Sequence, residues 1–438
     1  MPALDVWMNG ERVGRWTHAR GEDRFEYHSE WLESPLRRPL SLSMPLRPTG
    51  RPYATAVVRP FFDNLLPDSD ELRRRMMSRF GAASTGAFDL LEQVGRDCVG
   101  AVQLLPADAP APDVRRIEGR RIRDAAIAEL LSRVRTPALG AGDEEDFRLS
   151  LAGAQEKTAL LRHGGHWFIP QGATPSTHIF KLPILADDAF GPDLSASVEN
   201  EWLCAQLLPR LGVPCASCEM KTFDGQKVLV VERFDRVMAP DGRWIIRRPQ
   251  EDLCQATGTP PAKKYESQGG PGIFDIMTVL QGSTRPLEDR ADFFRTQLVF
   301  WLLCAIDGHA KNFSLFIEPE GRFVSTPRYD VLSAYPFLGK SPRHLSPHKV
   351  KLAMAVQGKN RHYRWKEIRV QHWLETGRRC GLPGSGRGIL DAVLEAVPRA
   401  IAETGARLPP GFPEAVHAPI FAGLERATKE ARAALASL

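Results

Sequence analysis

Alternating apolar and polar positions predict strands along the first half of the chain. From Asp5 to Gly14, Val6 and Met8 alternate with polar residues ahead of Asn9-Gly10, a pair typical of a two-residue hairpin turn. The same two-residue period recurs at 147–151 and 157–161, and the segments 99–105, 178–182 and 228–234 also favour strands. Strands are therefore expected at residues 5–8, 99–105, 147–151, 157–161, 178–182 and 228–234.

Apolar positions spaced three and four residues apart predict helices at other places. The segment 195–211 has one apolar face and is followed by Gly212 and Pro214, which are typical of a helix end. Residues 293–306 are apolar almost all round, so we expect a helix buried in a lobe core that leads directly to Asp307. The pattern favours helices from Gln250 onward. Helices are expected at 70–80, 122–134, 195–211 and 293–306.

The order of these elements predicts the domain organisation. A proline-rich stretch at 106–112 marks a linker. After it come strands, a strand carrying Lys181, a helix, another strand and then helices, the order found in a two-lobed kinase. We predict a mixed α/β (α+β), protein-kinase-like fold with nucleotide between the lobes. Its segments are a β-rich N-terminal subdomain at 1–110, a helical linker at 111–145, a nucleotide-binding lobe at 146–248 and a largely helical C-terminal lobe at 249–438.

An aspartate and an asparagine five positions apart, followed by a second aspartate, form the strongest candidate for catalysis. Asp307 and Asn312 are followed by Asp330 in Arg328-Tyr329-Asp330. Kinases present a catalytic base and two metal ligands in this order, because phosphoryl transfer needs a carboxylate near the attacking hydroxyl and oxygen ligands for Mg²⁺. A surface turn rich in Asp and Asn is the alternative for the first two residues.

A strand lysine and two helix glutamates could complete the phosphate site. Lys181 lies between apolar neighbours in His178–Pro183, where its ammonium could hold phosphates as a point charge. Glu199 or Glu201 in the following helix could pair with it, and we favour Glu201. A lysine whose head simply reaches solvent, and two solvated glutamates, are the alternatives.

The segment 150–157 is the candidate for a phosphate-covering loop. It is neither GxGxxG nor a Walker A sequence. Gly153 has full backbone freedom, and backbone N–H groups around it could bind phosphate. An ordinary hairpin turn is the alternative. The loop residues are Ala152, Gly153, Ala154, Gln155, Glu156 and Lys157.

Other residues near these motifs are candidates for nucleotide contacts. Backbone groups around Glu232 could bind adenine and Phe234 could contact its face, although a buried aromatic at a strand end fits equally well. His309 and Lys311 could touch phosphate, whereas a histidine in a polar loop is more often structural.

Composition places the protein in a broad class. The 438 residues, with 43% hydrophobic and 25% charged, are ordinary for a globular protein of two to three domains. No apolar run reaches the about eighteen residues of a membrane span, and residues 1–24 contain no apolar signal core, so a cytoplasmic location without membrane association is expected. Seven scattered cysteines predict reduced thiols. Cys215 and Cys218 have CxxC spacing, but no second pair completes a zinc site.

Positive charge is concentrated in one segment. Residues 340–387 contain twelve Lys or Arg and only Glu367 and Glu375 as acids, a local excess of +10 against a net charge of +5 for the whole chain. We call this segment the basic patch. It could follow a phosphate backbone, or it could be a solvated surface.

Several motifs together resemble one family of kinases. The sequences that carry the resemblance are Phe61–Pro67, Gly95–Asp97, Leu149–Leu161, Thr177–Pro183, Val231–Arg236, Pro249–Asp252, Lys264–Ser267 with Gly269–Gly272, and Asp307–Ser314. They are similar, in the same order and over nearly the whole chain, to the HipA family of bacterial serine/threonine kinase toxins.

The resemblance implies phosphorylation of a protein serine that depends on ATP and Mg²⁺. It implies Asp307 as catalytic base, Asn312 and Asp330 as metal ligands, and Ser150 as the site of an inactivating autophosphorylation, since a dianion beside a phosphate cradle repels ATP. The nucleotide contacts it implies are Ala152, Gly153, Ala154, Gln155, Glu156, Lys157, Lys181, Glu232, Arg233, Phe234, Gln250, His309, Ala310, Lys311, Asn312, Tyr329 and Asp330.

The resemblance also implies partners. The family phosphorylates aminoacyl-tRNA synthetases, glutamyl-tRNA synthetase among them, which stalls translation and induces dormancy and persistence. A small HipB-like helix-turn-helix antitoxin would neutralise the kinase and place it at operator DNA, hence at the nucleoid. A small-molecule kinase of the same fold and a DNA-binding co-repressor with secondary kinase activity are the alternatives. The motifs His-Arg-Asp and Asp-Phe-Gly of ordinary protein kinases are absent from the sequence.

Overall fold

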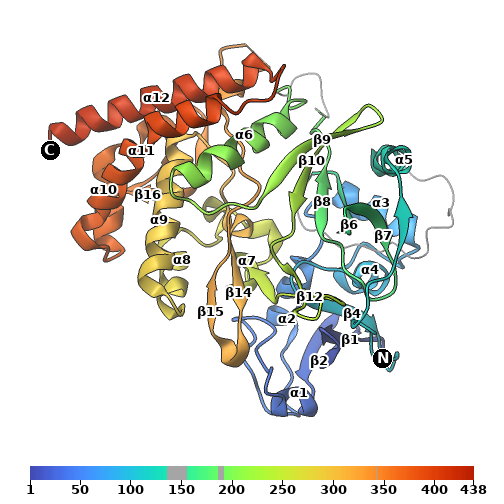
Figure 1. The fold of residues 1–438 in the computed structure, drawn as a ribbon. Helices are drawn as coiled ribbons and strands as arrows, with labels where there is room; N and C mark the ends of the chain where they lie inside the picture. Colours follow the sequence, from blue (N-terminus) through green and yellow to red (C-terminus); the bar gives the residue numbers. More distant parts are fainter. Residues whose placement is uncertain (136–154, 186–191, 342) are drawn as a thin grey trace. The chain divides into compact units, whose positions relative to one another are not determined.

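The computed structural model describes residues 1–135, 155–185, 192–341 and 343–438 (Figure 1). The chain divides into two compact units. The first unit contains Met1–Leu182, Lys221–Lys264 and Ser314–Phe323; the second contains Pro183–Met220, Tyr265–Phe313 and Val324–Leu438. The protein mixes helices and sheets, and its N-terminal region is rich in strands, as predicted.

A four-stranded antiparallel sheet opens the first unit. Its strands are β1 (Ala3–Met8), β2 (Glu11–Ala19), β3 (Glu22–Tyr27) and β4 (Val102–Pro106), in the order β3-β2-β1-β4. The predicted hairpin between β1 and β2 is confirmed, because Asn9 and Gly10 both adopt positive φ angles, 49° and 90°. The strand predicted at 99–105 begins only at Val102, after Gly100 turns at φ 73°.

Helices α1 (Ser29–Glu33), α2 (Thr55–Asp63), α3 (Asp70–Phe80) and α4 (Ala87–Val94) accompany this sheet. Trp16 of β2 stacks on Phe62 of α2 with ring centroids 3.9 Å apart, and both belong to one hydrophobic core. The prediction of α3 is confirmed at both ends. Ser69 accepts a hydrogen bond from the backbone N–H of Leu72, and Gly81 ends the helix at φ 67°.

The first unit also contains most of the sheet that carries Lys181. Its strands are β5 (Gly119–Ile122), β6 (Lys157–His163), β7 (His166–Pro170), β8 (His178–Lys181), β9 (Cys218–Phe223) and β10 (Gln226–Glu232), in the order β5-β7-β6-β8-β10-β9. Helix α5 (Asp124–Arg135) packs on it through Ile127 and Leu131. The helix predicted from Ile122 therefore starts two residues later, because Ile122 ends β5. The strand predicted at 147–151 lies outside the described residues.

The expectation of helices from Gln250 onward is wrong in part. Short strands β11 (Arg236–Met238) and β12 (Ile245–Arg247) precede a three-stranded sheet of β13 (Gln250–Asp252), β14 (Ser314–Ile317) and β15 (Phe323–Ser325). Helix α7 (Leu253–Ala256) follows β13. Residues 250–252 pair with 314–316, so these strands depend on a partner that is distant in sequence.

The second unit is mainly helical. Its helices are α6 (Ser197–Arg210), α8 (Ile273–Val279), α9 (Pro286–Leu302), α10 (Val370–Arg379), α11 (Arg387–Gly405) and α12 (Glu414–Ala436), with a hairpin of β16 (Lys351–Gln357) and β17 (Arg361–Arg364). Helix α11 packs against α6, α9 and α12 (Figure 1). The residues of the buried helix α9 include Phe293, Phe294 and Leu298.

Helix α9 ends earlier than the sequence indicated. It stops at Leu302 instead of running to Ile306. Cys304 adopts a left-handed φ of 51°, which breaks the helical repeat, and Ala305 then donates its N–H back to the carbonyl of Phe300. A short turn thus separates the helix from Asp307. None of the described helices is long and apolar enough to cross a membrane.

Candidate active site

The loop after α9 places Asp307 at the surface and Asn312 in the interior. Gly308 lies against the ring of Phe300, and a Cβ there would come within 2.5 Å of that ring, so only glycine fits. Residues Ala310–Asn312 form a 3-10 turn. The backbone N–H of His309 donates to the amide oxygen of Asn312 at 3.1 Å. This bond fixes the Asn312 side chain, so its orientation is set by the loop itself.

Asp330 joins this loop from a second segment. Asn312 donates from Nδ2 to Oδ2 of Asp330 at 3.4 Å, across 18 positions. Asp330 adopts a left-handed φ of 61°. The preceding residue, Tyr329, donates its hydroxyl to the carbonyl of Lys311 at 2.9 Å. The second unit therefore brings together Asn312 and Asp330, the two predicted metal ligands.

A buried arginine holds the segment that carries Asp330. Arg328 exchanges backbone hydrogen bonds of 2.8 Å with Pro214 and Ala216. Its guanidinium donates to the carbonyl of Thr326 at 2.7 Å, and burial lowers its pKa. These contacts lie entirely inside the second unit, so Asp330 projects from a fixed stretch of backbone.

The oxygens of Asn312 and Asp330 suit Mg²⁺ by their chemistry. Magnesium prefers amide, carboxylate, water and phosphate oxygens, and it commonly uses only one or two carboxylates together with substrate phosphates. Within the described part of the chain, no group of three or more His, Cys, Asp or Glu side chains could hold a metal alone. A site of this kind would share its ion with the nucleotide.

The carboxylate of Asp307 has a partner that the sequence did not single out. Tyr265 donates its hydroxyl to Oδ1 of Asp307. Its ring meets the ring of His309 edge-on, with centroids 5.0 Å apart. The only signal in the sequence was the position of Tyr265 within Lys264–Ser267, one of the motifs that carry the resemblance to the HipA family.

Lys181 and the start of β6 lie together in the first unit. Lys181 ends β8, where it is paired with Lys157 on one side and Leu229 on the other, and only 6% of it is exposed. Gln155 donates to the carbonyl of Leu182 at 2.6 Å, and Glu156 binds Arg75 at 2.7 Å. The remaining loop candidates, Ser150, Ala152, Gly153 and Ala154, lie outside the described residues.

The two glutamates proposed as partners of a phosphate-binding lysine lie in α6 of the second unit. Both are buried, with 3% of Glu199 and 6% of Glu201 exposed. Burial of two carboxylates in one helix indicates that each has polar surroundings. The choice of Glu201 over Glu199 stays a prediction.

The candidate adenine segment follows β10. Glu232 ends that strand opposite His178 and is exposed. Phe234 is half-buried, and its ring meets Phe316 edge-on at 5.8 Å. Gln250 is buried in β13. Gly100 packs closely on its backbone, because a Cβ added to Gly100 would lie 2.6 Å from the carbonyl oxygen of Gln250.

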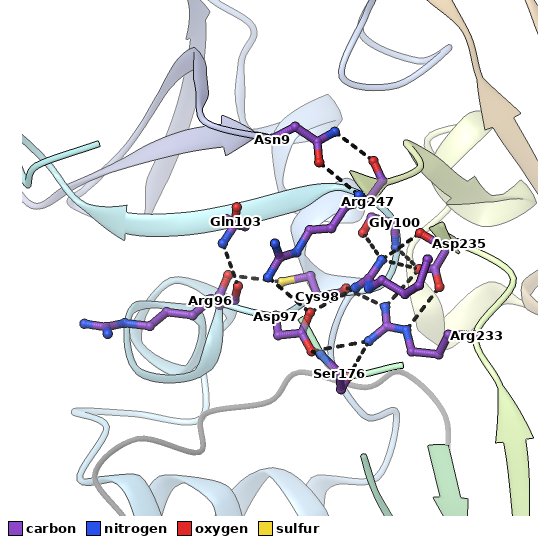
Figure 2. Close-up of polar contacts among 12 residues, drawn as sticks. Asn9, Arg96, Asp97, Cys98, Gly100, Gln103, Ser176, Arg233, Asp235 and Arg247 are labelled. Atoms are coloured by element: carbon purple, nitrogen blue, oxygen red, sulfur yellow. Dashed lines mark hydrogen bonds and ion pairs between the residues drawn. The ribbon is translucent and has the colours of Figure 1, made fainter. Parts of the chain in front are cut away.

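Arg233 lies in a buried cluster of charges, drawn in Figure 2. It donates to Asp235 from Nε and Nη2 at 3.1 and 2.9 Å. Its backbone N–H donates to Thr177, and its carbonyl accepts from Arg236. Because its side chain and both its backbone groups are engaged inside the protein, Arg233 supports the candidate adenine segment from within. The cluster consists of Asp97, Arg233, Asp235, Arg236 and Arg247.

This arginine–aspartate cluster contains more positive than negative side chains. Burial would raise the pKa of Asp235, but the guanidiniums of Arg233 and Arg236 outweigh it and lower this pKa to about 2. Arg247 approaches Asp97 only to 3.6 Å. Among the described residues, none accepts a hydrogen bond from its guanidinium, and burial lowers its pKa to about 9. Three cations thus face two anions in a closed interior.

The basic patch covers β16, β17 and α10 and is partly neutralised. Glu375 accepts from Arg378 and Arg379 at 2.7 and 2.6 Å. Arg364 pairs with Glu367, and Arg361 pairs with Glu266. The formal excess of positive charge therefore overstates the charge that this surface presents.

Comparison with protein families identifies both parts of the chain. Residues 4–105 match the family model described as the HipA N-terminal domain. Residues 149–401 match the one described as the HipA-like C-terminal domain. Together the two models cover most of the sequence.

Relatives of similar length match along more than nine tenths of the chain. A protein of Sinorhizobium fredii that bears the name kinase Y4mE is 34% identical over 92% of this chain and 92% of its own. The serine/threonine-protein kinase toxin HipA of Shewanella oneidensis is 27% identical over 93% of this chain and 90% of its own.

A solved structure confirms the predicted fold class. The complex of HipA, HipB and operator DNA from Shewanella oneidensis contains a chain that matches with a TM-score of 0.79. The match has 25% sequence identity and covers 99% of this chain and 97% of that chain.

Proposed function

Since the chain belongs to the HipA family of kinases, we propose that it transfers the γ-phosphoryl group of ATP to a serine or threonine hydroxyl of a protein. The observation that carries this proposal is the contact between Asp330 and Asn312, which lies on the loop that begins with Asp307. A base and two oxygen ligands are what in-line phosphoryl transfer requires of a protein.

In the proposed reaction, Asp307 accepts the proton of the acceptor hydroxyl. The acceptor oxygen forms a bond to the γ-phosphorus while the bond to the β–γ bridging oxygen breaks, and ADP leaves. The amide oxygen of Asn312 and the carboxylate of Asp330 would hold Mg²⁺. When bound, the ion neutralises negative charge on the phosphates. Lys181, in the first unit, would supply a positive charge for binding nucleotide phosphate.

The remaining nucleotide contacts belong to the same proposal. Residues 152–157 would cover the phosphates. Glu232 and Phe234 would contact adenine. Further proposed nucleotide contacts are Gln250, His309, Ala310, Lys311 and Tyr329. Arg233 would act by holding this segment in place, since its side chain donates to Asp235 and Ser176. Ser150 would be the autophosphorylation site that switches the kinase off.

We further propose the partners of the kinase. Its substrate would be an aminoacyl-tRNA synthetase, glutamyl-tRNA synthetase or a relative, whose phosphorylation would halt translation. A HipB-like antitoxin would neutralise it and bring it to operator DNA, in the cytoplasm or at the nucleoid. The complex of the Shewanella oneidensis relative with HipB and operator DNA supports this second part.

The test is incubation of the protein with radiolabelled ATP, Mg²⁺ and purified synthetases, followed by detection of the labelled band. Asp307→Asn should lower the rate of labelling by about 10²- to 10⁴-fold, because it removes the general base. Asp224→Asn, at an exposed hairpin turn, is the matched control and should label like the wild type. Equal labelling by both variants would refute the role of Asp307.

Ser150→Ala separates autophosphorylation from substrate phosphorylation. The variant should still label the synthetase. Mass spectrometry of the intact kinase chain should no longer detect a phosphate on it. Phosphate that persists and maps to another residue would exclude Ser150.

A further inference from the structure

The hydrogen bond between Tyr265 and Asp307 joins two segments of the second unit that lie 42 positions apart. Asp307 is exposed, whereas Tyr265 is half-buried with its ring edge-on to His309. His309 is itself buried beside Asn312. The tyrosine ring is therefore held against the same loop whose carboxylate it contacts.

The backbone of Tyr265 is also fixed. Its carbonyl accepts hydrogen bonds from the N–H groups of Gln268 and Gly270, both at 3.0 Å. These two bonds close the loop just after the tyrosine. The position of the phenol thus does not depend on its ring contacts alone.

The neighbouring residue anchors this loop to β16. Glu266 accepts the backbone N–H of Ala355 at 2.6 Å and pairs with Arg361 at 3.4 Å. Gly272 lies so close that a Cβ there would come within 2.4 Å of the Glu266 carboxyl group. Because the Glu266 side chain is held on several sides, the backbone that carries the neighbouring Tyr265 is fixed as well.

We propose that Tyr265 is a positioning residue for the catalytic base. A carboxylate at the surface can rotate about its Cβ–Cγ bond, and only some rotations direct an oxygen at the acceptor hydroxyl. The Tyr265 hydroxyl, donating to Oδ1, holds one rotation and stabilises the ionised form that accepts a proton. This inference rests on the proposed kinase function.

The opposite role, in which Tyr265 blocks the site, leads to a different expectation. If the phenol merely occupied the place of the acceptor hydroxyl, its removal would open the site and raise activity. If it positions the base, removal leaves binding intact and slows the chemical step. The direction of the change in kcat therefore distinguishes a residue that positions the base from one that blocks the acceptor's place.

The experiment compares Tyr265→Phe with wild type in steady-state phosphorylation of a synthetase between pH 5 and 9. Phenylalanine keeps the ring contact with His309 and removes only the hydroxyl. We expect kcat to fall by about 10-fold, the worth of one hydrogen bond to a charged group, with KM for ATP and protein unchanged. The acidic limb of the kcat–pH profile should move to higher pH, because a carboxylate that loses a donor is protonated more easily.

Tyr53→Phe is the matched control. Its hydroxyl donates to the carbonyl of Pro45 in the N-terminal region, so its loss should change neither kcat nor the pH profile. Thermal unfolding of each variant checks that the fold is retained. An unchanged or increased kcat for Tyr265→Phe, or an unmoved pH profile, overturns the positioning role while the kinase function stands. If the wild type itself transfers no phosphate to protein, the proposed function fails, and the inference with it.

Discussion

Asn9 and Arg247 exchange two hydrogen bonds across 238 positions of sequence. Asn9 donates from Nδ2 to the Arg247 carbonyl at 2.8 Å, and its Oδ1 accepts the Arg247 N–H at 2.9 Å. Asn9 lies in the β1–β2 turn, and Arg247 ends β12 and belongs to the arginine–aspartate cluster (Figure 2). The turn of the N-terminal sheet is thereby fastened to the strands that follow the candidate adenine segment.

Removal of the Asn9 side chain should weaken the first unit. Asn9→Gly keeps the positive φ of the turn but loses both hydrogen bonds, so we expect a loss of about 1–3 kcal/mol in the free energy of unfolding. Asp224→Gly is the matched control, since Asp224 holds the same kind of turn position at φ 44° and is exposed. Urea unfolding measures both; an equal loss in the two variants would assign the effect to the turn and not to Arg247.

Two arginines of the buried cluster should respond oppositely to substitution. Arg233→Met leaves Asp235 with less compensation and should cost about 3 kcal/mol or more. Arg247→Met removes a cation whose nearest ion-pair contact is 3.6 Å and should stabilise the protein by about 1 kcal/mol. Thermal unfolding at neutral pH compares the two. A similar loss in both variants would show that Arg247 balances the cluster as well as Arg233 does.

Stability should depend on pH through Glu251. This residue of β13 accepts the N–H of Leu42 at 2.8 Å, and burial raises its pKa from an ordinary 4.5 to about 8. The folded state therefore holds a proton that the unfolded chain has released, so stability falls as pH rises from about 4.5 to 8. Glu251→Gln keeps the acceptor for Leu42 but cannot ionise.

The free energy of unfolding of wild type and Glu251→Gln, measured in urea at pH 5 and pH 8, checks this prediction. The free energy of unfolding of Glu251→Gln, relative to that of the wild type, should be higher at pH 8 than at pH 5. A difference between the proteins that stays constant with pH would mean that Glu251 does not titrate in this range.

Asp330 should control the requirement for magnesium. Asp330→Asn tolerates the left-handed φ of 61° but replaces a carboxylate ligand by an amide. We expect the Mg²⁺ concentration for half-maximal phosphorylation to rise by at least about 10-fold. A magnesium titration of kinase activity measures it, with Asp224→Asn as control. An unchanged titration midpoint would remove Asp330 from the metal site.

The basic patch should contribute to DNA binding mainly through exposed residues that form no ion pair with any described residue. Lys349 and Lys359 are exposed, whereas Arg378 is held by Glu375 at 2.7 Å. In a complex with the antitoxin, Lys349→Ala or Lys359→Ala should reduce the slope of log affinity against log salt by about 1 each. Arg378→Ala should change it less. Equal slopes for all three variants and the wild type would make the patch a solvated surface.

Local signals in the sequence were sufficient for several elements. Helix α3 was predicted at 70–80, and the structure shows that the Ser69 side chain caps its start and a left-handed Gly81 ends it. The β1–β2 hairpin was predicted from Asn9-Gly10, whose two residues both adopt positive φ angles. Strand β13 and the early end of α9 could not be predicted, because one needs β14 as partner and the other depends on a left-handed Cys304.

The sequence by itself determined the order of Asp307, Asn312 and Asp330, and with it the family of kinases, because spacing and motif are properties of the chain alone. Only the tertiary structure decided that Asn312 reaches Asp330, that Tyr265 binds Asp307, and that the Arg233 side chain is buried. Such contacts join residues far apart in sequence, and they form only when packing closes the chain between them. Residue identity limits which groups can pair, whereas the fold selects which of them meet.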